Sequence, residues 1–499
     1  MQKENKKIQE RFQKRNQSFM SAGFENMKKD KIKKEIALRK QARLERFTAI
    51  RKVTEAFNDL ALSQESLSES IEMIFSSNQE ANIKGACNIR RILSKEFVPP
   101  TQEVVDAGVI PILINFIKRF DCPQLQYEAA WALCNIASGE EKHTLKIIQH
   151  GGVPFILDLL ESPFDNIKDQ GLWVLGNITG DKSSYSEIIC KYDGVPRIIK
   201  VITESKSDSL LKSATWALGN ICKGERAPDF IVIKDAVWVF CDMLHKEDEE
   251  ILQNALWVLS SITECSEESG NMLITKGVLS KIKSFLYHKE YNIYLPSVLI
   301  LGHISAGSDD QTSAVVNCGA IEAVVPLLNA PKKEIRKEAA WFLSNISAGD
   351  YNHIQKLIDA EVFPKIIRML FREEREVQFE ALWTIVNAVG KGNNEQVNYL
   401  VRVGVLSAIV FCLSVSDPKF LQVAFLAIKL ILESGKQLST ESGSNPYAVI
   451  FEESGGVESL ENLQKHHNYK IYQEANNLVT KFFGGVSEDQ DLIDMINSP

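Results

Sequence analysis

The sequence lacks the features that several large classes of proteins require. No apolar run approaches the roughly 20 residues of a membrane helix, and the N-terminus has no apolar segment typical of a secretory signal. The nine cysteines are scattered, without a C-x-x-C pair or a Cys/His cluster at metal-ligand spacing. The eight histidines stand apart, and no nucleophile–base pairing or Gly-rich phosphate loop is present. We therefore expect a protein that is not an enzyme, has no metal or cofactor, and keeps reduced thiols in the cytoplasm or nucleus.

Basic residues are in deficit overall, yet they are concentrated at the N-terminus. The 499 residues carry 57 Lys and Arg against 65 Asp and Glu, a net charge of −8. Residues 1–52 hold 17 basic and 6 acidic residues (+11), so the remainder holds 40 and 59 (−19). This division indicates recognition of a partner, or of the acidic body by its own arm, with a solubilising tail as the alternative. Residues 31–57 can form a basic helix when bound, and an acidic protein is favoured over a membrane as its partner.

Tryptophan is the residue that reveals the organisation of the chain. Six of the seven Trp residues recur at intervals of 41 to 43 residues, with one double interval, at positions 131, 173, 216, 257, 341 and 383. The missing position in the double interval is Leu299. A period near 42 lies in the range of armadillo and HEAT repeats. With 44% hydrophobic residues, such an array can bury a long continuous core in which each unit contacts only its neighbours.

A Gly–apolar–apolar phrase recurs between the short first helix and the second helix of many units. It begins at Gly108, Gly152, Gly194, Gly277, Gly319, Gly404 and Gly456. Gly permits a sharp turn, and a following Pro suits the first turn of the next helix, such as 111–118 or 154–160. A third helix then carries the Trp. The sequence therefore predicts an all-α fold: a right-handed armadillo-repeat solenoid of about ten three-helix units, with a flexible basic N-terminal arm.

Each of five Trp residues is followed four positions later by Asn, and this pairing predicts a surface that binds an extended basic chain. Residues four apart share a helix face. An Asn amide can bond both the C=O and the N–H of a peptide. Indoles along the groove would form slots between them for Lys or Arg side chains. The carboxylates that would take the cations are those of Asp181, Glu250, Asp309, Glu338 and Glu380.

Core packing is the alternative for any single Trp in this ladder. A buried Asn needs hydrogen-bond partners, and we expect no reason for a core to place Asn at the same position five times. The five pairs in register are therefore interpreted as a binding surface.

These motifs resemble those of the importin α family, the adaptors of nuclear import. The likeness covers almost the whole chain. Three segments resemble the family's second to fourth repeats: EAAWALCNIASG (128–139), DQGLWVLGNITGD (169–181) and ATWALGNIC (214–222). Three further segments resemble the family's fifth, seventh and eighth repeats: EILQNALW (250–257), KEAAWFLSNISAG (337–349) and EALWTIVNAVGKG (380–392). The arm segment Ile36-Ala-Leu-Arg-Lys40 is similar to the importin-β-binding domain.

The resemblance implies two grooves for nuclear localisation signals and an arm that binds importin β. The implied major-groove residues are Trp131, Asn135, Gly139, Thr144, Gln170, Trp173, Asn177, Asp181, Trp216, Asn220, Glu250 and Trp257. The implied minor-groove residues are Asp309, Thr312, Glu338, Trp341, Asn345, Glu380, Trp383 and Asn387. In the arm they are Arg39, Lys40, Arg43, Arg51 and Lys52.

The resemblance also implies how the chain is divided. It comprises an importin-β-binding arm (1–57), a linker (58–70), cargo-binding repeats (71–484) and an acidic tail (485–499). The major groove covers about 108–260, the minor groove about 277–392, and a C-terminal repeat for an export receptor about 445–484.

The implied partners are cargo proteins with localisation signals, importin β and the export receptor, and nucleoporins are left open. No direct contact with nucleic acid or membrane is implied, and the protein would shuttle between cytoplasm and nucleus through the pore. An armadillo-repeat scaffold or chaperone for other extended segments is the alternative.

Several positions depart from the family pattern. Leu299 and His303 stand where the family has Arg and Asn, Ser261 where it has Tyr, Ser213 where it has Asn, and Asn254 where it has Asp. In the arm, the autoinhibitory Lys-Arg-Arg triplet of the family aligns with residues 49–51, which are Ala-Ile-Arg here. We therefore expect little autoinhibition and a minor groove weaker than the major one.

Overall fold

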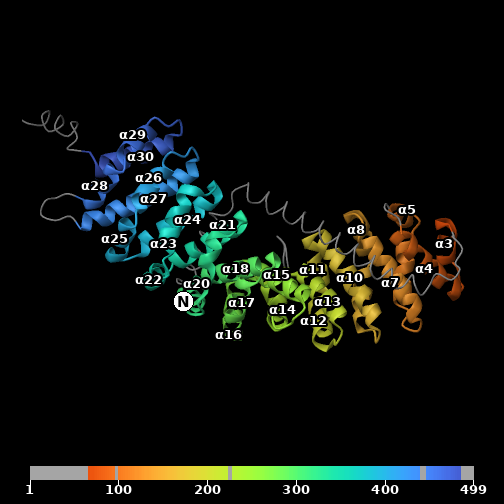
Figure 1. The fold of residues 1–499 in the computed structure, drawn as a ribbon. Helices are drawn as coiled ribbons and strands as arrows, with labels where there is room; N and C mark the ends of the chain where they lie inside the picture. The colour runs from red at the N-terminus through yellow and green to blue at the C-terminus, as the bar shows by residue number, and fades with distance from the viewer. Residues whose placement is uncertain (1–65, 96–98, 223–227, 439–444, 485–499) are drawn as a thin grey trace, which may run out of the picture. The chain divides into compact units, whose positions relative to one another are not determined.

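The computed structural model describes residues 66–95, 99–222, 228–438 and 445–484, and every regular element within them is a helix (Figure 1). These helices divide into two compact units, one ending at Lys276 and one beginning at Gly277. The predicted all-α armadillo fold is confirmed. The predicted arm and acidic tail lie outside the described residues.

The first unit contains fourteen described α-helices and two short 3-10 helices. They are α3 (Leu67–Ile74), α4 (Gln79–Lys95), α5 (Thr101–Asp106), α6 (Val109–Ile117), α7 (Pro123–Ala137), α8 (Glu141–Gln149), α9 (Gly152–Asp158), η1 (Leu159–Glu161), α10 (Asp165–Asp181), η2 (Ser183–Tyr185), α11 (Ser186–Lys191), α12 (Gly194–Glu204), α13 (Asp208–Ile221), α14 (Phe230–Met243), α15 (Glu249–Cys265) and α16 (Glu267–Lys276).

The second unit continues the same alternation of short and long helices. It contains α17 (Leu279–Ser284), η3 (Phe285–Tyr287), α18 (Tyr291–Ser305), α19 (Asp309–Asn317), α20 (Ala320–Val324), η4 (Val325–Asn329), α21 (Lys333–Ser347), α22 (Tyr351–Asp359), α23 (Val362–Arg372), α24 (Arg375–Lys391), α25 (Asn394–Arg402), α26 (Val405–Cys412), α27 (Pro418–Gln437), α28 (Pro446–Glu453), α29 (Gly456–Leu463) and α30 (Tyr469–Phe482).

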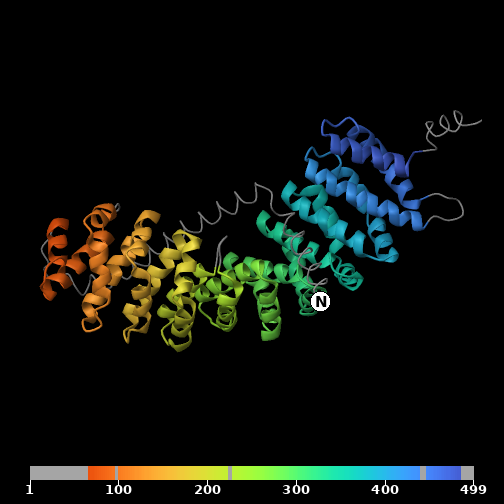
Figure 2. The same ribbon diagram turned by 180° about the vertical axis from the view of Figure 1, so that it is seen from behind.

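The long third helices form a continuous row within each unit. In the first unit α4, α7, α10, α13 and α15 pack each against the next, and in the second unit α18, α21, α24, α27 and α30 do the same (Figure 2). The six recurring Trp positions and Leu299 all lie on these helices. The 42-residue period therefore brings equivalent positions of neighbouring third helices side by side.

The turn between first and second helices is left-handed, but the sequence placed it one residue late in three repeats. The predicted Gly108, Gly277, Gly319 and Gly404 do have positive φ angles of 73–96°. In the other three repeats the turn residue precedes the predicted glycine and is Gly151, Asp193 or Gly455, with φ of 69°, 55° and 77°. Because the turn residue caps the second helix, helices such as α6 and α9 also begin two residues earlier than predicted.

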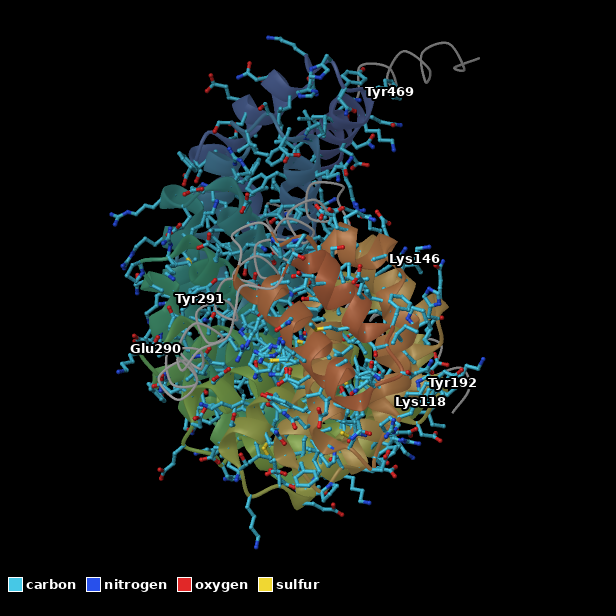
Figure 3. All side chains as sticks on the ribbon, turned by 90° about the vertical axis from the view of Figure 1, so that its right-hand side faces the viewer. Lys118, Lys146, Tyr192, Glu290, Tyr291 and Tyr469 are labelled. Atoms are coloured by element: carbon cyan, nitrogen blue, oxygen red, sulfur yellow. The ribbon has the colours of Figure 1, made fainter. Side chains whose placement is uncertain are left out.

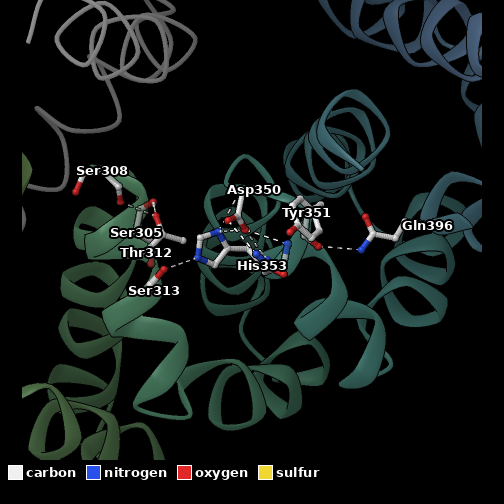
Figure 4. Close-up of polar contacts among 9 residues, drawn as sticks. Ser305, Ser308, Thr312, Ser313, Asp350, Tyr351, His353 and Gln396 are labelled. Carbon is white, nitrogen blue, oxygen red and sulfur yellow. Dashed lines mark hydrogen bonds and ion pairs between the residues drawn. The ribbon is translucent and has the colours of Figure 1, made fainter. Parts of the chain in front are cut away.

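First helices of the second unit are tied to one another by their capping side chains (Figure 4). The ring Nδ1 of His353 accepts from the backbone N–H of Asp350 at 3.1 Å, and its Nε2 lies 2.9 Å from Ser313 Oγ on α19. Gln396 on α25 donates to the Tyr351 carbonyl at 2.8 Å. These bonds link α19, α22 and α25 and fix the spacing of the repeats on this side.

Charged side chains and a few aromatic rings cover the surface. Lys118, Lys146 and Tyr192 extend from the first unit (Figure 3), and the Lys118 ammonium lies 3.8 Å from the centre of the Phe155 ring. Among the described residues, no single helix is long and apolar enough to cross a membrane, although two bent helix pairs have suitable length and composition. The same residues contain no group of three His, Cys, Asp or Glu side chains that could hold a metal.

Two glycines let neighbouring third helices approach closely. A Cβ added to Gly176 on α10 would lie 2.0 Å from the Trp216 ring of α13, and one added to Gly302 on α18 would lie 2.2 Å from the Trp341 ring of α21. Each indole therefore rests on the backbone of the preceding third helix.

This contact predicts that Gly176→Ala destabilises the first unit. Ala is the better helix former by about 1 kcal/mol, but the clash with Trp216 should outweigh this gain and cost roughly 1–3 kcal/mol. Gly180→Ala on the same helix is the matched control, because its Cβ would meet its nearest atom at 3.6 Å. Thermal unfolding followed by circular dichroism would measure both; equal stability of the two variants would contradict the close packing.

Candidate functional site

The Trp/Asn ladder lies on six third helices, five of which carry both residues, and it is divided between the two units. In the first unit it comprises Trp131 and Asn135 on α7, Trp173 and Asn177 on α10, Trp216 and Asn220 on α13, and Trp257 without an Asn on α15. In the second unit it comprises Trp341 and Asn345 on α21, and Trp383 and Asn387 on α24. The helices that carry each set pack in sequence, so the side chains of each set form one row.

Every ladder Asn donates a hydrogen bond from Nδ2 to the third helix before it. Asn177 reaches the Cys134 carbonyl at 3.4 Å and Asn220 the Gly176 carbonyl at 3.0 Å. Asn345 and Asn387 reach the carbonyls of Gly302 and Ser344, both at 3.0 Å. Asn135 donates to the Arg90 carbonyl at 3.1 Å and to Ser94 Oγ at 2.9 Å.

These bonds correct one step of the sequence interpretation. A core does have a reason to repeat Asn, because its amide joins consecutive third helices where a buried donor needs a partner. An Asn amide has two N–H groups and an acceptor oxygen, so it can form further hydrogen bonds after this one. The recurrence of Asn therefore supports a structural role as well as a binding role.

The indoles do not all leave a slot between them, as the sequence had suggested. The ring centres of Trp173 and Trp216 lie 4.7 Å apart at an interplanar angle of 41°. Rings at this distance touch, so no lysine or arginine stem can pass between them, and that part of the prediction is wrong. A ligand side chain at these two positions would have to lie on an outer face.

The first unit already contains a cation bound as the slot hypothesis requires. The Arg90 guanidinium lies 4.4 Å from the centre of the Trp131 ring, and its Nε lies 2.5 Å from a carboxylate oxygen of Glu128. Glu128 stands three residues before Trp131, as Glu338 and Glu380 stand three before Trp341 and Trp383. Sequence reasoning missed Glu128, although this shared spacing could have identified it.

A polar cluster follows the ladder on α10. The Thr144 hydroxyl of α8 donates to Asp181 Oδ2 at 2.5 Å and lies 3.4 Å from the Ala137 carbonyl. Gly139 lies between α7 and α8, and a Cβ there would lie 2.6 Å from the His143 ring. Three of the residues expected in the major groove are thus gathered at the ends of α7, α8 and α10, where the bond from Thr144 orients the carboxylate of Asp181.

Some buried polar atoms in or beside the ladder have no hydrogen-bond partner within the described residues, and two of them bear on ligand binding. They are the acceptor Oε1 of Gln170, one turn before Trp173, and the donor Nε1 of Trp383. Leaving such atoms unpaired costs about 1–3 kcal/mol each. A bound peptide could supply a donor to the first and an acceptor to the second.

Glu250 has a partner that the sequence interpretation did not anticipate. Lys212 on α13 lies 2.6 Å from Asp248 and 3.4 Å from Glu250. The hydrogen bond to Asp248 raises the pKa of Lys212. An internal cation therefore shares the Glu250 carboxylate with any ligand.

The acids of the second unit surround a lysine of their own. Lys337 Nζ lies 3.4 Å from Glu338 on the same helix, α21. Glu380 on α24 is only 6% exposed. Burial raises the pKa of Glu380 to about 8, with the neighbouring Glu338 adding to the effect and Lys337 opposing it. Without a further cation nearby, this carboxyl is therefore harder to ionise than an exposed one.

Asp309 and Thr312 lie at the start of α19. Asp309 is exposed in the first turn, whereas Thr312 is buried and its hydroxyl lies 3.0 Å from the carbonyls of Ser305 and Ser308 (Figure 4). Thr312 thus has the same place in its repeat as Thr144 in the first unit. The arm residues Arg39, Lys40, Arg43, Arg51 and Lys52 lie outside the described residues.

Family models and solved structures place the fold among armadillo-repeat proteins. Residues 97–138, 141–180, 183–223 and 308–348 match the Armadillo/beta-catenin-like repeat, and residues 445–495 match the Atypical Arm repeat. An engineered protein of known crystal structure is 25% identical, with a TM-score of 0.75 over 85% of this chain and all of that one.

Curated relatives define the family more narrowly. Importin subunit alpha-2 of Arabidopsis thaliana is 43% identical over 84% of this chain and 79% of its own length. Importin subunit alpha-B of Dictyostelium discoideum is 41% identical over 85% of this chain and 83% of its own length. Importin subunit alpha-1b of Oryza sativa is 33% identical over 86% and 80%. The chain therefore belongs to the importin α family of nuclear import adaptors.

The buried Glu380 should lower the stability of the folded protein in a pH-dependent way, and a neutral residue in its place should remove this effect. In the unfolded chain this carboxyl ionises near pH 4.5, and in the folded protein near 8. Below pH 4.5 both states are protonated and the cost is absent; it grows as pH rises towards 8 and is constant above. As the pH rises from 5.5 to 8.5, the apparent unfolding temperature of Glu380→Gln should therefore increase relative to that of the wild type by roughly 2–5 °C.

The control for this prediction is Glu474→Gln on α30, which replaces an exposed carboxylate. Its unfolding temperature should track the wild type at both pH values. A constant difference between Glu380→Gln and wild type across this range would show that Glu380 is ionised throughout.

Proposed function

We propose that this protein binds Lys/Arg-rich nuclear localisation signals in an extended conformation along the ladder and connects the cargo to importin β through its basic arm. The observation that carries the proposal is the bound guanidinium of Arg90, held between the Trp131 indole and the Glu128 carboxylate. A cargo cation placed over an outer indole face near an acid would meet the same chemistry. Membership of the importin α family supports the adaptor role.

The peptide backbone would be held by the ladder amides. Each Asn is fixed in orientation by its bond to the preceding helix, so its remaining hydrogen-bonding groups are preorganised. A regular row of such groups recognises an extended backbone without selecting its side chains. Side-chain selection would then depend on the indoles and carboxylates between them.

The strongest cationic pocket would be the one around Asp181. The proposed major groove comprises the ladder residues of α7, α10, α13 and α15 with Gly139, Thr144, Gln170, Asp181 and Glu250. The proposed minor groove comprises the ladder residues of α21 and α24 with Asp309, Thr312, Glu338 and Glu380. The protein would return cargo-free by binding an export receptor through residues 445–484, and would thus act in both cytoplasm and nucleus.

Charge reversal at Asp181 tests the major groove. Asp181→Lys places a like charge beside Thr144, where a cargo lysine would bind, so affinity for a basic signal peptide should fall at least about 100-fold. Fluorescence anisotropy with a labelled Lys-rich peptide would measure it. Glu103→Lys on α5 is the control with the same change in net charge at an exposed site. Equal affinity of both variants would refute the pocket and leave an armadillo scaffold for other segments as the better function.

Deletion of the arm tests autoinhibition. Residues 49–51 offer one cation where three would compete with cargo, and each lost cation removes a pocket contact even though tethering raises the effective concentration. Removing residues 1–59 should therefore raise peptide affinity by less than about tenfold. The same deletion should abolish binding to importin β in a pull-down. A larger gain in peptide affinity would mean that the arm is an effective competitor.

A further inference from the structure

The third helix α18 departs from its neighbours at three positions at once. Three residues before the ladder position, α21 and α24 carry Glu338 and Glu380, whereas α18 carries Pro296. At the ladder position itself α18 has Leu299 instead of Trp, and four residues later His303 instead of Asn. The acid, the indole and the amide are therefore all absent from this helix at the places where α21 and α24 have them.

The backbone at this place nevertheless keeps the geometry of the ladder. Asn345 of α21 donates to the Gly302 carbonyl of α18 at 3.0 Å, as Asn387 donates to Ser344. The Trp341 ring rests on Gly302, where a Cβ would lie 2.2 Å away. The change on α18 is therefore one of side-chain chemistry and not of helix position, so a peptide extended along α21 and α24 would continue over α18.

The side chains that replace the ladder form an apolar contact surface. Leu299 and His303 are one helical turn apart on one face, and both are partly exposed. The His303 ring meets the Trp341 indole at 5.3 Å between centres, edge to face at 70°. The indole thus has an imidazole as its neighbour on α18, and an isobutyl group stands four residues before that imidazole.

A lysine or arginine over α18 would gain little from these groups. Leu299 has no π face and Pro296 has no carboxylate, so a cation placed there would lose part of its hydration with no indole or acid of α18 itself to compensate. A leucine or an aromatic side chain would instead bury apolar area against Leu299 and the imidazole ring of His303. The ladder positions of α18 thus favour an apolar ligand side chain, whereas those of α21 and α24 favour a cationic one.

We propose that the minor groove prefers an apolar or aromatic cargo side chain over α18, at Leu299 and His303, next to the basic residues held by α21 and α24. Its cargo would be a mixed signal, basic at some positions and apolar at one. The inference rests on the proposed function, because it requires a peptide extended along the ladder.

The test uses the full chain carrying Asp181→Lys, so that binding reports on the second unit. A basic peptide is scanned with Leu and then Phe at each position in turn, and affinities are measured by fluorescence anisotropy at pH 7.5. At one position Leu or Phe should bind about 3–10-fold more tightly than Lys. Adding Leu299→Trp with His303→Asn should reverse that preference at that position alone.

Two controls separate this preference from general effects. Ile450→Trp adds an indole at an exposed apolar site on α28, outside the row of third helices, and should leave the preference unchanged. A peptide with a photoreactive phenylalanine at the preferred position should crosslink to α18, as mapped by mass spectrometry. Circular dichroism would confirm that the variants are folded.

The inference is overturned if Lys is preferred at every position, if Leu299→Trp with His303→Asn changes nothing, if the crosslink maps away from α18, or if no peptide binds the Asp181→Lys protein. The proposed function fails in a different way, through absence of binding between the unmodified basic peptide and the wild-type protein. The two failures are therefore distinguishable in one set of titrations.

Discussion

The hydrogen bond from each ladder asparagine to the preceding third helix determines the geometry of the rest of the surface. In four repeats the acceptor is the carbonyl directly before the Asn position of that helix, which His303 occupies on α18: Cys134, Gly176, Gly302 or Ser344. A shift of one residue between neighbouring third helices would break this hydrogen bond and would move the indole away from the backbone on which it packs. The bond thus fixes register within each unit, and the row of indoles and acids follows from that register.

One consequence is that stability and recognition share the same side chains. Asn220 joins two helices and, in the proposed function, also bonds a ligand backbone, and Trp216 lies against both Gly176 and the Trp173 ring. Loss of affinity after truncating either residue would therefore combine a lost contact with a disturbed helix pair. Charge changes at pocket acids, which leave this packing intact, separate the two effects.

The sequence predicted the repeat, its helices and the ladder because these depend on a period of about 42 residues, and a period survives local variation. It misplaced turns at Gly151, Asp193 and Gly455, since an αL residue is set by backbone geometry and not by residue type alone. It missed the internal bonds of Asn, the pairing of Glu250 with Lys212 and the touching rings of Trp173 and Trp216. Each of these depends on distances between repeats, which no pattern within one repeat contains.

Internal cations determine how selective the acidic positions can be. Lys212 forms an ion pair with Glu250, and Lys337 forms one with Glu338. A ligand cation must compete with these lysines, so its net gain is the difference between two ion pairs and not the whole of one. Thr144 bonds Asp181 through a neutral hydroxyl, which orients the carboxylate. A single position of this kind can set the register of a basic peptide, because shifting the peptide by one residue exchanges its best-matched cation for another side chain.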